Sequence, residues 1–228
     1  MVSGKGKGAR GSDTRRAEDL RKRARRIAEA LRKLYPSAGL ELEFENPFQL
    51  LVKAILAAQE SDRKVNEVGR DFFRKYAKPE DIVKVPLEEL ERDLSSINFY
   101  RRKAKLLKKC CEVLVREFGG EVPRSVEEMV KLPGVGRKTA NMVLGGAFGL
   151  PAVIVDRHVL RVSRRIGLTL SEDPDQVEME LRELIPRSEW TEFSFLLLNH
   201  GKRVCLARRP LCERCPICDL CDSCGVKL

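Results

Sequence analysis

The sequence predicts an all-α fold, and three observations support this prediction. Almost every segment after residue 20 repeats its apolar residues with the 3.6-residue period of an amphipathic helix. Only one run, "PAVIV" at residues 151–155, has the composition of a strand, and it is short. No repeat of fixed period is present. The chain has 228 residues, 43% of them hydrophobic and 34% charged, which suffices for one large or two small soluble domains.

The helices follow from periodicity and from residues that favour helix ends. An Arg-rich amphipathic helix is expected over residues 20–34. The next helix opens with Asn46 as its N-cap and Pro47 at its first position. A long helix over residues 103–118 ends at Gly119. The remaining helical segments are expected at residues 123–132, 136–149, 156–167, 173–186 and 189–205.

The net charge of +10 is concentrated at the N-terminus. Residues 1–33 hold twelve Lys and Arg against four Asp and Glu, so the rest of the chain is close to neutral. Residues 1–17 are expected to form a disordered basic arm, which either aids solubility or touches phosphates without sequence preference. The apolar runs are too short to span a membrane, and no secretory signal is visible. We expect a prokaryotic protein of the cytoplasm or nucleoid, and the scarcity of Gln and Asn favours a thermophile.

The stretch "LPGVGRKTAN", residues 132–141, predicts a glycine turn between two short helices. Gly134 and Gly136 allow another backbone to approach closely, and the N–H groups at the start of the second helix can hold a phosphate. A plain helix connection is the alternative, but the surrounding basic residues favour DNA. We therefore expect Gly134, Val135, Gly136 and Arg137 to contact the DNA backbone. The basic neighbours are Lys131, Arg137, Lys138, Arg157, Arg161, Arg164 and Arg165.

Lys138 is in the first turn of the second helix, where the positive pole of the helix disfavours an ammonium group. An uncharged amine is a nucleophile that can form a Schiff base, whereas a charged one would simply reach a phosphate. Asp156 follows an apolar run and opens a helix, so it is either an N-cap or a catalytic carboxylate. The eight residues from Phe148 to Asp156 can span about 26 Å, which is enough to bring Asp156 back to the level of Lys138.

Six of the eight cysteines lie in the last 24 residues, which predicts a metal site in a cytosolic protein. Five of the six recur every three residues, so several choices of ligand could bind zinc or an iron–sulfur cluster. Cys110 and Cys111 lie in a helix near a core and are given no role.

The order "LPGVGRKTAN…VDRHVLR" followed by C-x6-C-x2-C-x5-C resembles the endonuclease III family of DNA glycosylases. The resemblance runs from about residue 20 to 222 and includes the Ala-Gln-x-x-Asp element of "AAQESD". It implies a two-domain helix-hairpin-helix glycosylase fold. Residues 40–151 would form a six-helix barrel domain ending in the hairpin, and residues 18–39 with 152–228 would form a helical iron–sulfur domain.

The resemblance also implies the chemistry of base excision repair. A bifunctional DNA glycosylase and AP lyase flips a damaged base, expected to be an oxidised pyrimidine, out of double-stranded DNA. Lys138 attacks C1′ and Asp156 assists it, and β-elimination then nicks the strand. Gln59 matches a residue that fills the gap left by the flipped base, and Phe99 matches a wedge; the alternatives are a polar helix end and a loop aromatic on the core. Asp62 matches the family motif or caps the next helix.

The family spacing implies a [4Fe–4S] cluster on Cys205, Cys212, Cys215 and Cys221. Cys218 and Cys224 are then spare thiols, and either could compete as a ligand. The first loop of this segment carries basic residues that we expect to touch phosphates, with a solvated basic loop as the alternative. They are Lys202, Arg203, Arg208 and Arg209. We expect a monomer.

Three other readings remain open. Relatives that excise uracil, mismatched thymine or adenine use water as the nucleophile, and they usually lack the lysine at position 138. In a DNA-binding module without catalysis, the cluster would be a structural or redox part and Lys138 would serve binding alone. An electron carrier built on the cysteines would explain neither feature.

Overall fold

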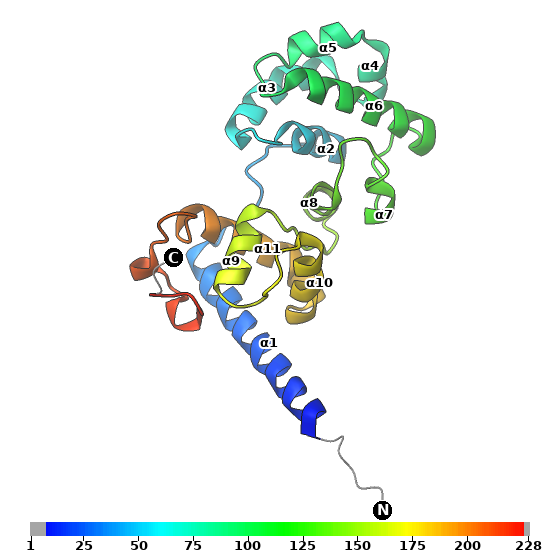
Figure 1. The fold of residues 1–228 in the computed structure, drawn as a ribbon. Coiled ribbons are helices and arrows are strands. Elements are labelled where there is room, and N and C mark those ends of the chain that lie inside the picture. Colours follow the sequence, from blue (N-terminus) through cyan, green and yellow to red (C-terminus); the bar gives the residue numbers. More distant parts are fainter. Residues whose placement is uncertain (1–7, 226–228) are drawn as a thin grey trace, which may run out of the picture. The chain divides into compact units, whose positions relative to one another are not determined.

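The computed structural model describes residues 8–225, and every regular element in this range is a helix (Figure 1). The all-α prediction is therefore confirmed. The segment 151–155 is extended but pairs with no strand in the described part of the chain; the backbone N–H of Ile154 donates instead to Ser194 Oγ at 2.9 Å. Among the described residues no helix is long and apolar enough to cross a membrane.

The chain forms two compact units. Unit 1 combines the N-terminal segment up to Gly39 with the segment from Val153 onward, and unit 2 is the continuous stretch Leu40–Ala152. Each unit is described separately below.

Unit 2 is built around α2. This helix packs against α3, α6 and α8, while α4 and α5 pack against α6 (Figure 1). Its apolar residues Leu50, Leu51, Val52 and Leu56 are at most 1% exposed. Each such side chain contributes about 1.5–3 kcal/mol through burial. The helices of unit 2 are α2 (Pro47–Leu56), α3 (Asp62–Lys75), α4 (Pro79–Lys84), α5 (Leu87–Asp93), α6 (Tyr100–Phe118), α7 (Val126–Met129) and α8 (Arg137–Ala147).

Two helix ends predicted in unit 2 are confirmed, whereas α6 begins earlier than expected, at Tyr100, and the helix expected over residues 123–132 is shorter. Asn46 caps α2 by accepting a hydrogen bond from the backbone N–H of Gln49 at 3.0 Å, and Pro47 is the first helical residue. Gly119 ends α6 with φ of 61°, a left-handed conformation that glycine adopts without steric cost.

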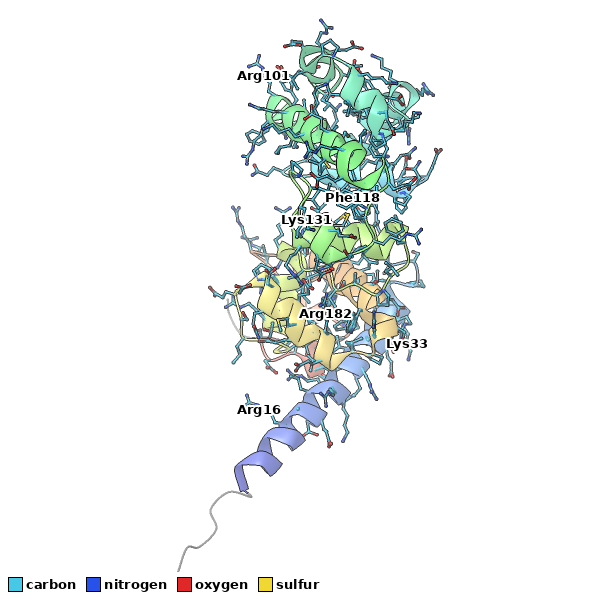
Figure 2. All side chains as sticks on the ribbon, turned by 90° about the vertical axis from the view of Figure 1, so that its right-hand side faces the viewer. Arg16, Lys33, Arg101, Phe118, Lys131 and Arg182 are labelled. Atoms are coloured by element: carbon cyan, nitrogen blue, oxygen red, sulfur yellow. A yellow bond between two sulfur atoms is a disulfide. The ribbon has the colours of Figure 1, made fainter. Side chains whose placement is uncertain are left out.

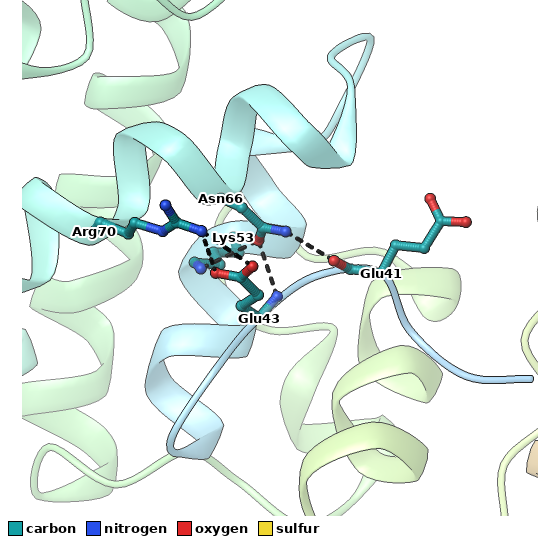
Figure 3. A network of polar contacts seen from close by, with 5 residues as sticks. All are labelled: Glu41, Glu43, Lys53, Asn66 and Arg70. Atoms are coloured by element: carbon teal, nitrogen blue, oxygen red, sulfur yellow. Dashed lines mark hydrogen bonds and ion pairs between the residues drawn. The ribbon is translucent and has the colours of Figure 1, made fainter. Parts of the chain in front are cut away.

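A polar network fixes the start of unit 2 to α2 and α3 (Figure 3). Lys53 is 3% exposed, and its Nζ donates to Asn66 Oδ1 at 3.2 Å. The Asn66 amide also donates to Glu41 O at 2.8 Å and accepts from the Glu43 N–H at 2.9 Å, while Arg70 pairs with the Glu43 carboxylate at 3.3 Å. Burial lowers the pKa of Lys53. The hydrogen bonds of the network hold this buried amine in place, so the network has a structural role.

Unit 1 is built around α11, which packs against α1 and α9, while α10 packs against α1 and α9. Its core contains Leu31 of α1, Val162 of α9, Leu181 of α10 and Leu197 of α11, each at most 1% exposed. The helices are α1 (Gly8–Leu34), α9 (Arg157–Arg165), α10 (Pro174–Leu184) and α11 (Trp190–Arg203), with 3-10 turns at η1 (Arg187–Glu189), η2 (Cys212–Arg214) and η3 (Cys218–Leu220).

The first helix begins earlier than the sequence suggested. The basic arm was expected over residues 1–17, but α1 starts at Gly8, and only residues 1–7 of the arm lie outside the described residues. Arg16, Ala17 and Glu18 are good helix formers, so a helix that is anchored further along can extend through them.

Candidate functional site

The glycine turn of unit 2 joins α7 to α8 with the expected hairpin geometry. Gly134 has φ of 84°, which a residue with a side chain rarely adopts, and the Val135 N–H closes the turn on Leu132 O at 3.1 Å. Gly136 is the N-cap of α8 with φ of −96°, so only one of the two glycines uses a left-handed conformation. A Cβ on Gly136 would meet nothing within 4 Å, so the approach to this helix start is open.

Basic residues flank this turn on both sides. Lys131, which precedes it, is exposed (Figure 2), and Arg137 is the first residue of α8. The first turn of α8 holds no acidic residue that would offset the positive pole of the helix. An open helix start with positive charge beside it suits an anion such as a phosphate.

Lys138 is the second residue of α8 and is exposed. Three residues further on, Asn141 is 1% exposed, and neither atom of its amide has a hydrogen-bond partner. Lys138 is thus exposed on α8, while Asn141, one turn further along the same helix, is buried. This is a rigid base for a reactive side chain.

Asp156 begins α9 in unit 1, and its side chain caps the helix. Its Oδ1 accepts hydrogen bonds from the backbone N–H groups of His158 and Val159, both at 2.8 Å. The N-cap role expected as one reading of Asp156 is therefore confirmed, and it uses one carboxylate oxygen. A cap also fixes the direction of the carboxylate, which a catalytic role requires as well.

Two arginines counted as basic neighbours of DNA are used inside unit 1. Arg161 donates to Gly201 O at 2.8 Å and to Cys205 O at 3.0 Å. Arg165 donates to Leu206 O at 2.7 Å and Ala207 O at 2.8 Å. Both guanidinium groups therefore hold the cysteine loop onto α9.

Arg164 is also engaged, because it pairs with Glu172 at 2.6 Å. Arg161, Arg164 and Arg165 were counted as basic surroundings of the glycine turn in the sequence, and that count overlooked their intramolecular partners.

The four cysteines chosen by family spacing line one hollow in unit 1. Cys205 is buried, and Cys212, Cys215 and Cys221 are partly buried. Ile217, which is 1% exposed, anchors the surrounding loop in the core of the unit.

The two remaining cysteines of the tail, Cys218 and Cys224, form a disulfide with each other. In the disulfide, neither sulfur is a free thiol that could compete as a ligand. Nothing in the sequence indicated this pairing.

The cysteine hollow brings several sulfur ligands together in one part of unit 1. Among residues 8–225 no group of three or more His, Cys, Asp or Glu side chains is placed to hold one metal ion. Burial raises the pKa of Cys215, and its neighbours Cys221, Cys205 and Cys212 raise it further. Cysteine sulfur is the ligand type that zinc and iron–sulfur clusters both use.

The loop of the first two cysteines carries exposed charge. Arg208 and Arg209 are exposed between Cys205 and Cys212, and Arg203 lies over the Tyr35 ring at 5.6 Å. Lys202 is partly buried in the last turn of α11. Of the four basic residues proposed for phosphate contact, Arg203, Arg208 and Arg209 are thus exposed.

Gln59 and Phe99, the residues expected to enter the duplex, share one unusual property. They are the non-glycine residues with positive φ in the described chain, 55° for Gln59 and 59° for Phe99. Each such conformation costs on the order of 1–3 kcal/mol. Phe99 is 63% exposed and does not pack on the core, so the alternative reading of a core aromatic is wrong.

The neighbouring Asp62 is the first residue of α3 and does not cap it. Ser61 is the N-cap, because its hydroxyl accepts from the Lys64 N–H at 3.2 Å. The negative charge of Asp62 in the first turn of α3 still interacts favourably with the helix dipole.

These features define a helical DNA-repair protein with a hairpin and a cysteine-rich loop. Residues 52–187 match the family model of the HhH-GPD superfamily base excision DNA repair proteins. The chain belongs to this superfamily and, within it, to the endonuclease III family. It is 45% identical to endonuclease III of Synechocystis over 88% of this chain and 92% of the relative, and 46% identical to that of Bacillus subtilis over 80% and 84%.

Solved structures agree with this assignment. A trapped endonuclease III–DNA covalent intermediate is 43% identical and matches with a TM-score of 0.85, over 89% of this chain and 95% of the other. A thermostable thymine-DNA glycosylase is 27% identical and matches with a TM-score of 0.77, over 88% and 96%. The predicted family and fold are confirmed.

Proposed function

We propose that this protein is a bifunctional DNA glycosylase and AP lyase of base excision repair, acting on double-stranded DNA that contains an oxidised pyrimidine or an abasic site. The observation that carries this proposal is Lys138 in an open, basic helix start directly after the glycine turn. Membership of the endonuclease III family and the likeness to a DNA-bound covalent intermediate support it.

Lys138 is assigned the nucleophile. Its uncharged Nζ forms a bond to C1′ of the flipped nucleotide, and the C1′–N bond to the base breaks with its electron pair leaving on the base, which takes up a proton. The C1′–O4′ bond of the sugar then breaks, O4′ takes up a proton, and the Lys138 nitrogen and C1′ are joined as a protonated imine. Removal of a C2′ proton then expels the 3′ phosphate oxygen, and the strand is nicked.

Asp156 is assigned the acceptor of the amine proton and the group that stabilises positive charge on the sugar. The capping bonds orient its carboxylate before substrate arrives. General-base assistance of this kind contributes typically 10²–10⁴-fold to a rate.

The cysteine hollow is assigned a [4Fe–4S] cluster on Cys205, Cys212, Cys215 and Cys221. Family membership supports an iron–sulfur cluster in general. These four cysteines line the hollow, and the fifth cysteine there, Cys224, is held in a disulfide, which supports the choice of the four as ligands. A bound cluster would supply cross-links between loop segments that have little core of their own. Arg161 and Arg165 of α9 hold the loop backbone, and the exposed Arg208 of the loop is assigned to a phosphate.

The hairpin residues Gly134, Val135, Gly136 and Arg137 are assigned to the DNA backbone, together with Lys202, Arg203 and Arg208. Gln59 and Phe99 are assigned to the gap and the wedge. Exposure of Phe99 and the open space before Gly136 support these roles.

A second candidate is a monofunctional glycosylase that excises uracil or mismatched thymine with water as nucleophile. The likeness to a thymine-DNA glycosylase favours it. Lys138 favours the bifunctional enzyme, because a water mechanism has no use for an amine at this position.

A turnover panel separates the two candidates. Duplex oligonucleotides carrying an oxidised pyrimidine, uracil, a G·T mismatch or an abasic site are incubated with the protein, and products are resolved with and without alkali. The proposal predicts nicked strands without alkali from the oxidised pyrimidine and from the abasic site. Strands that break only after alkali treatment, or excision confined to uracil and thymine, would establish the second candidate.

A further inference from the structure

The loops that carry Gln59 and Phe99 are joined by hydrogen bonds within unit 2. The Asn98 backbone N–H donates to Glu60 Oε2 at 2.9 Å, and the Asn98 side-chain amide donates to Gln59 O at 3.3 Å. Asn98 donates both hydrogen bonds, one from its backbone to a side chain and one from its side chain to a backbone, across 38 and 39 residues of sequence. We call Glu60, Asn98 and Lys103 the clasp.

Lys103 is the buried member of the clasp. It is 4% exposed, and its Nζ donates to Leu56 O at 2.7 Å, at the end of α2. Glu60 is close enough to act on the charge of Lys103. The start of α6, which follows Phe99, is therefore tied to the end of α2, which precedes Gln59.

Glu60 holds both loops through separate oxygens. Its Oε1 accepts from the Ser61 N–H at 3.0 Å, while Oε2 accepts from Asn98. The hydrogen bonds from Asn98 and Ser61 lower the pKa of Glu60, so the group is a carboxylate at neutral pH. Hydrogen bonds to a carboxylate are stronger than those between neutral groups.

The clasp lies directly beside the strained residues. Gln59 precedes Glu60, and Phe99 follows Asn98, and both have left-handed backbones. Such conformations persist only where surrounding contacts fix them. Asn98 and Glu60 supply those contacts, while Leu94 and Ile97, both at most 2% exposed, anchor the second loop in the core.

We propose that Glu60 and Asn98 are positioning residues, which lock the Gln59 and Phe99 loops at a fixed spacing so that both side chains enter the duplex as one rigid probe. This inference rests on the proposed roles of Gln59 and Phe99. Rigid presentation favours base opening because the side chains are ordered before they meet DNA.

The test measures base opening without chemistry. In a Lys138→Gln background, duplex DNA carries an oxidised pyrimidine with 2-aminopurine next to it in the same strand, and the 2-aminopurine fluorescence rises when the oxidised pyrimidine leaves the stack. Glu60→Ala and Asn98→Ala should each slow this rise on the order of tenfold, as expected when a positioned group is displaced. The DNA dissociation constant should change less than about threefold, because phosphate contacts dominate affinity.

The controls distinguish positioning from charge and from folding. Glu117→Ala removes the same charge from an exposed position on α6, where Glu117 pairs with its neighbour Arg116, and it should leave the rise unchanged. Glu60→Gln keeps one acceptor oxygen and should be intermediate. The double variant Glu60→Ala/Asn98→Ala should be no slower than the worse single variant, because both remove one unit.

The inference is overturned if opening stays fast in both single variants, or if it slows only in proportion to weaker DNA binding or to a lower melting temperature. The outcome is independent of the lyase assignment. Failure of the wild-type protein to form a covalent adduct with abasic DNA would reject the proposed function, whereas the fluorescence measurement would still decide whether the clasp controls opening.

Discussion

At the scale of single residues, Asp156 combines a structural and a proposed chemical role. Its Oδ1 caps α9, and a cap contributes about 1 kcal/mol to stability. Asparagine caps a helix about as well as aspartate but carries no charge. This difference allows the two roles to be separated.

Asp156→Asn should therefore slow excision and strand cleavage by about 10²–10⁴-fold while leaving the melting temperature within a few degrees of wild type. Single-turnover rates on an oxidised-pyrimidine duplex, with thermal unfolding in parallel, give both values. As a matched comparison, Asp156→Ala should lose the cap as well and melt earlier. Full activity in Asp156→Asn would contradict the proposed chemical role and leave Asp156 with the capping role alone.

The residues with proposed chemical roles could be named from the sequence, because each is a residue type that is unusual at its position. A lysine at a positive helix pole and cysteines in close spacing are visible without a structure. The clasp was not foreseeable, because a glutamate after a helix and an asparagine before one are ordinary loop residues. Only the fold brings Glu60 and Asn98 together, and only backbone angles reveal the strain at Gln59 and Phe99.

At the scale of elements, the cysteine loop and the hairpin differ in what holds them. The hairpin is closed by its own backbone and by buried Leu132 and Val135. The loop of Cys205–Cys221 depends on Arg161, Arg165 and the buried Ile217, and the 3-10 turns η2 and η3 lie between its cysteines. A cluster would add the cross-links that this loop otherwise lacks.

Cys205→Ser should lose the yellow-brown colour and the bound iron and should lower the melting temperature of the protein. The double variant Cys218→Ser/Cys224→Ser should keep its full iron and sulfide content, since these two thiols are paired with each other. Iron, sulfide and zinc analysis of the purified variants measures this. Colourless wild-type protein that contains zinc, or loss of iron from the double variant, would contradict the ligand assignment.

The limits of helix prediction also appear at this scale. Caps such as Asn46 and Gly119 were recognised because they act on adjacent residues. The partners of Arg161 and Arg165 were missed because they lie about 40 residues away along the chain. Periodicity reports which face of a helix is buried, but it does not report which loop covers that face.

At the scale of the whole molecule, charge and chain organisation determine how the protein binds DNA. Unit 1 is assembled from both ends of the chain, and unit 2 is continuous. The net charge of +10 is concentrated before residue 34, while the proposed phosphate contacts of the hairpin and the cysteine loop are local. Binding should therefore depend on a few positions rather than on total charge.

Arg208→Ala should reduce the slope of log Kd against log salt by about one, because one phosphate contact is lost. Its affinity should weaken similarly for damaged and undamaged duplexes, since a phosphate carries no sequence information. Arg116→Ala removes an equal charge from α6 and should leave the slope unchanged. Fluorescence anisotropy over a series of salt concentrations measures both, and an equal effect of the two substitutions would indicate a bulk charge effect.

The central claim is that the Lys138 amine bonds to deoxyribose, and borohydride trapping tests it most directly. The wild-type protein is mixed with duplex DNA containing an abasic site, the imine is reduced, and the adduct is resolved by denaturing electrophoresis and mapped by peptide mass. We predict a covalent adduct at Lys138 that Lys138→Gln abolishes while still binding the same duplex. An adduct at another residue, or undiminished trapping in Lys138→Gln, would contradict the account.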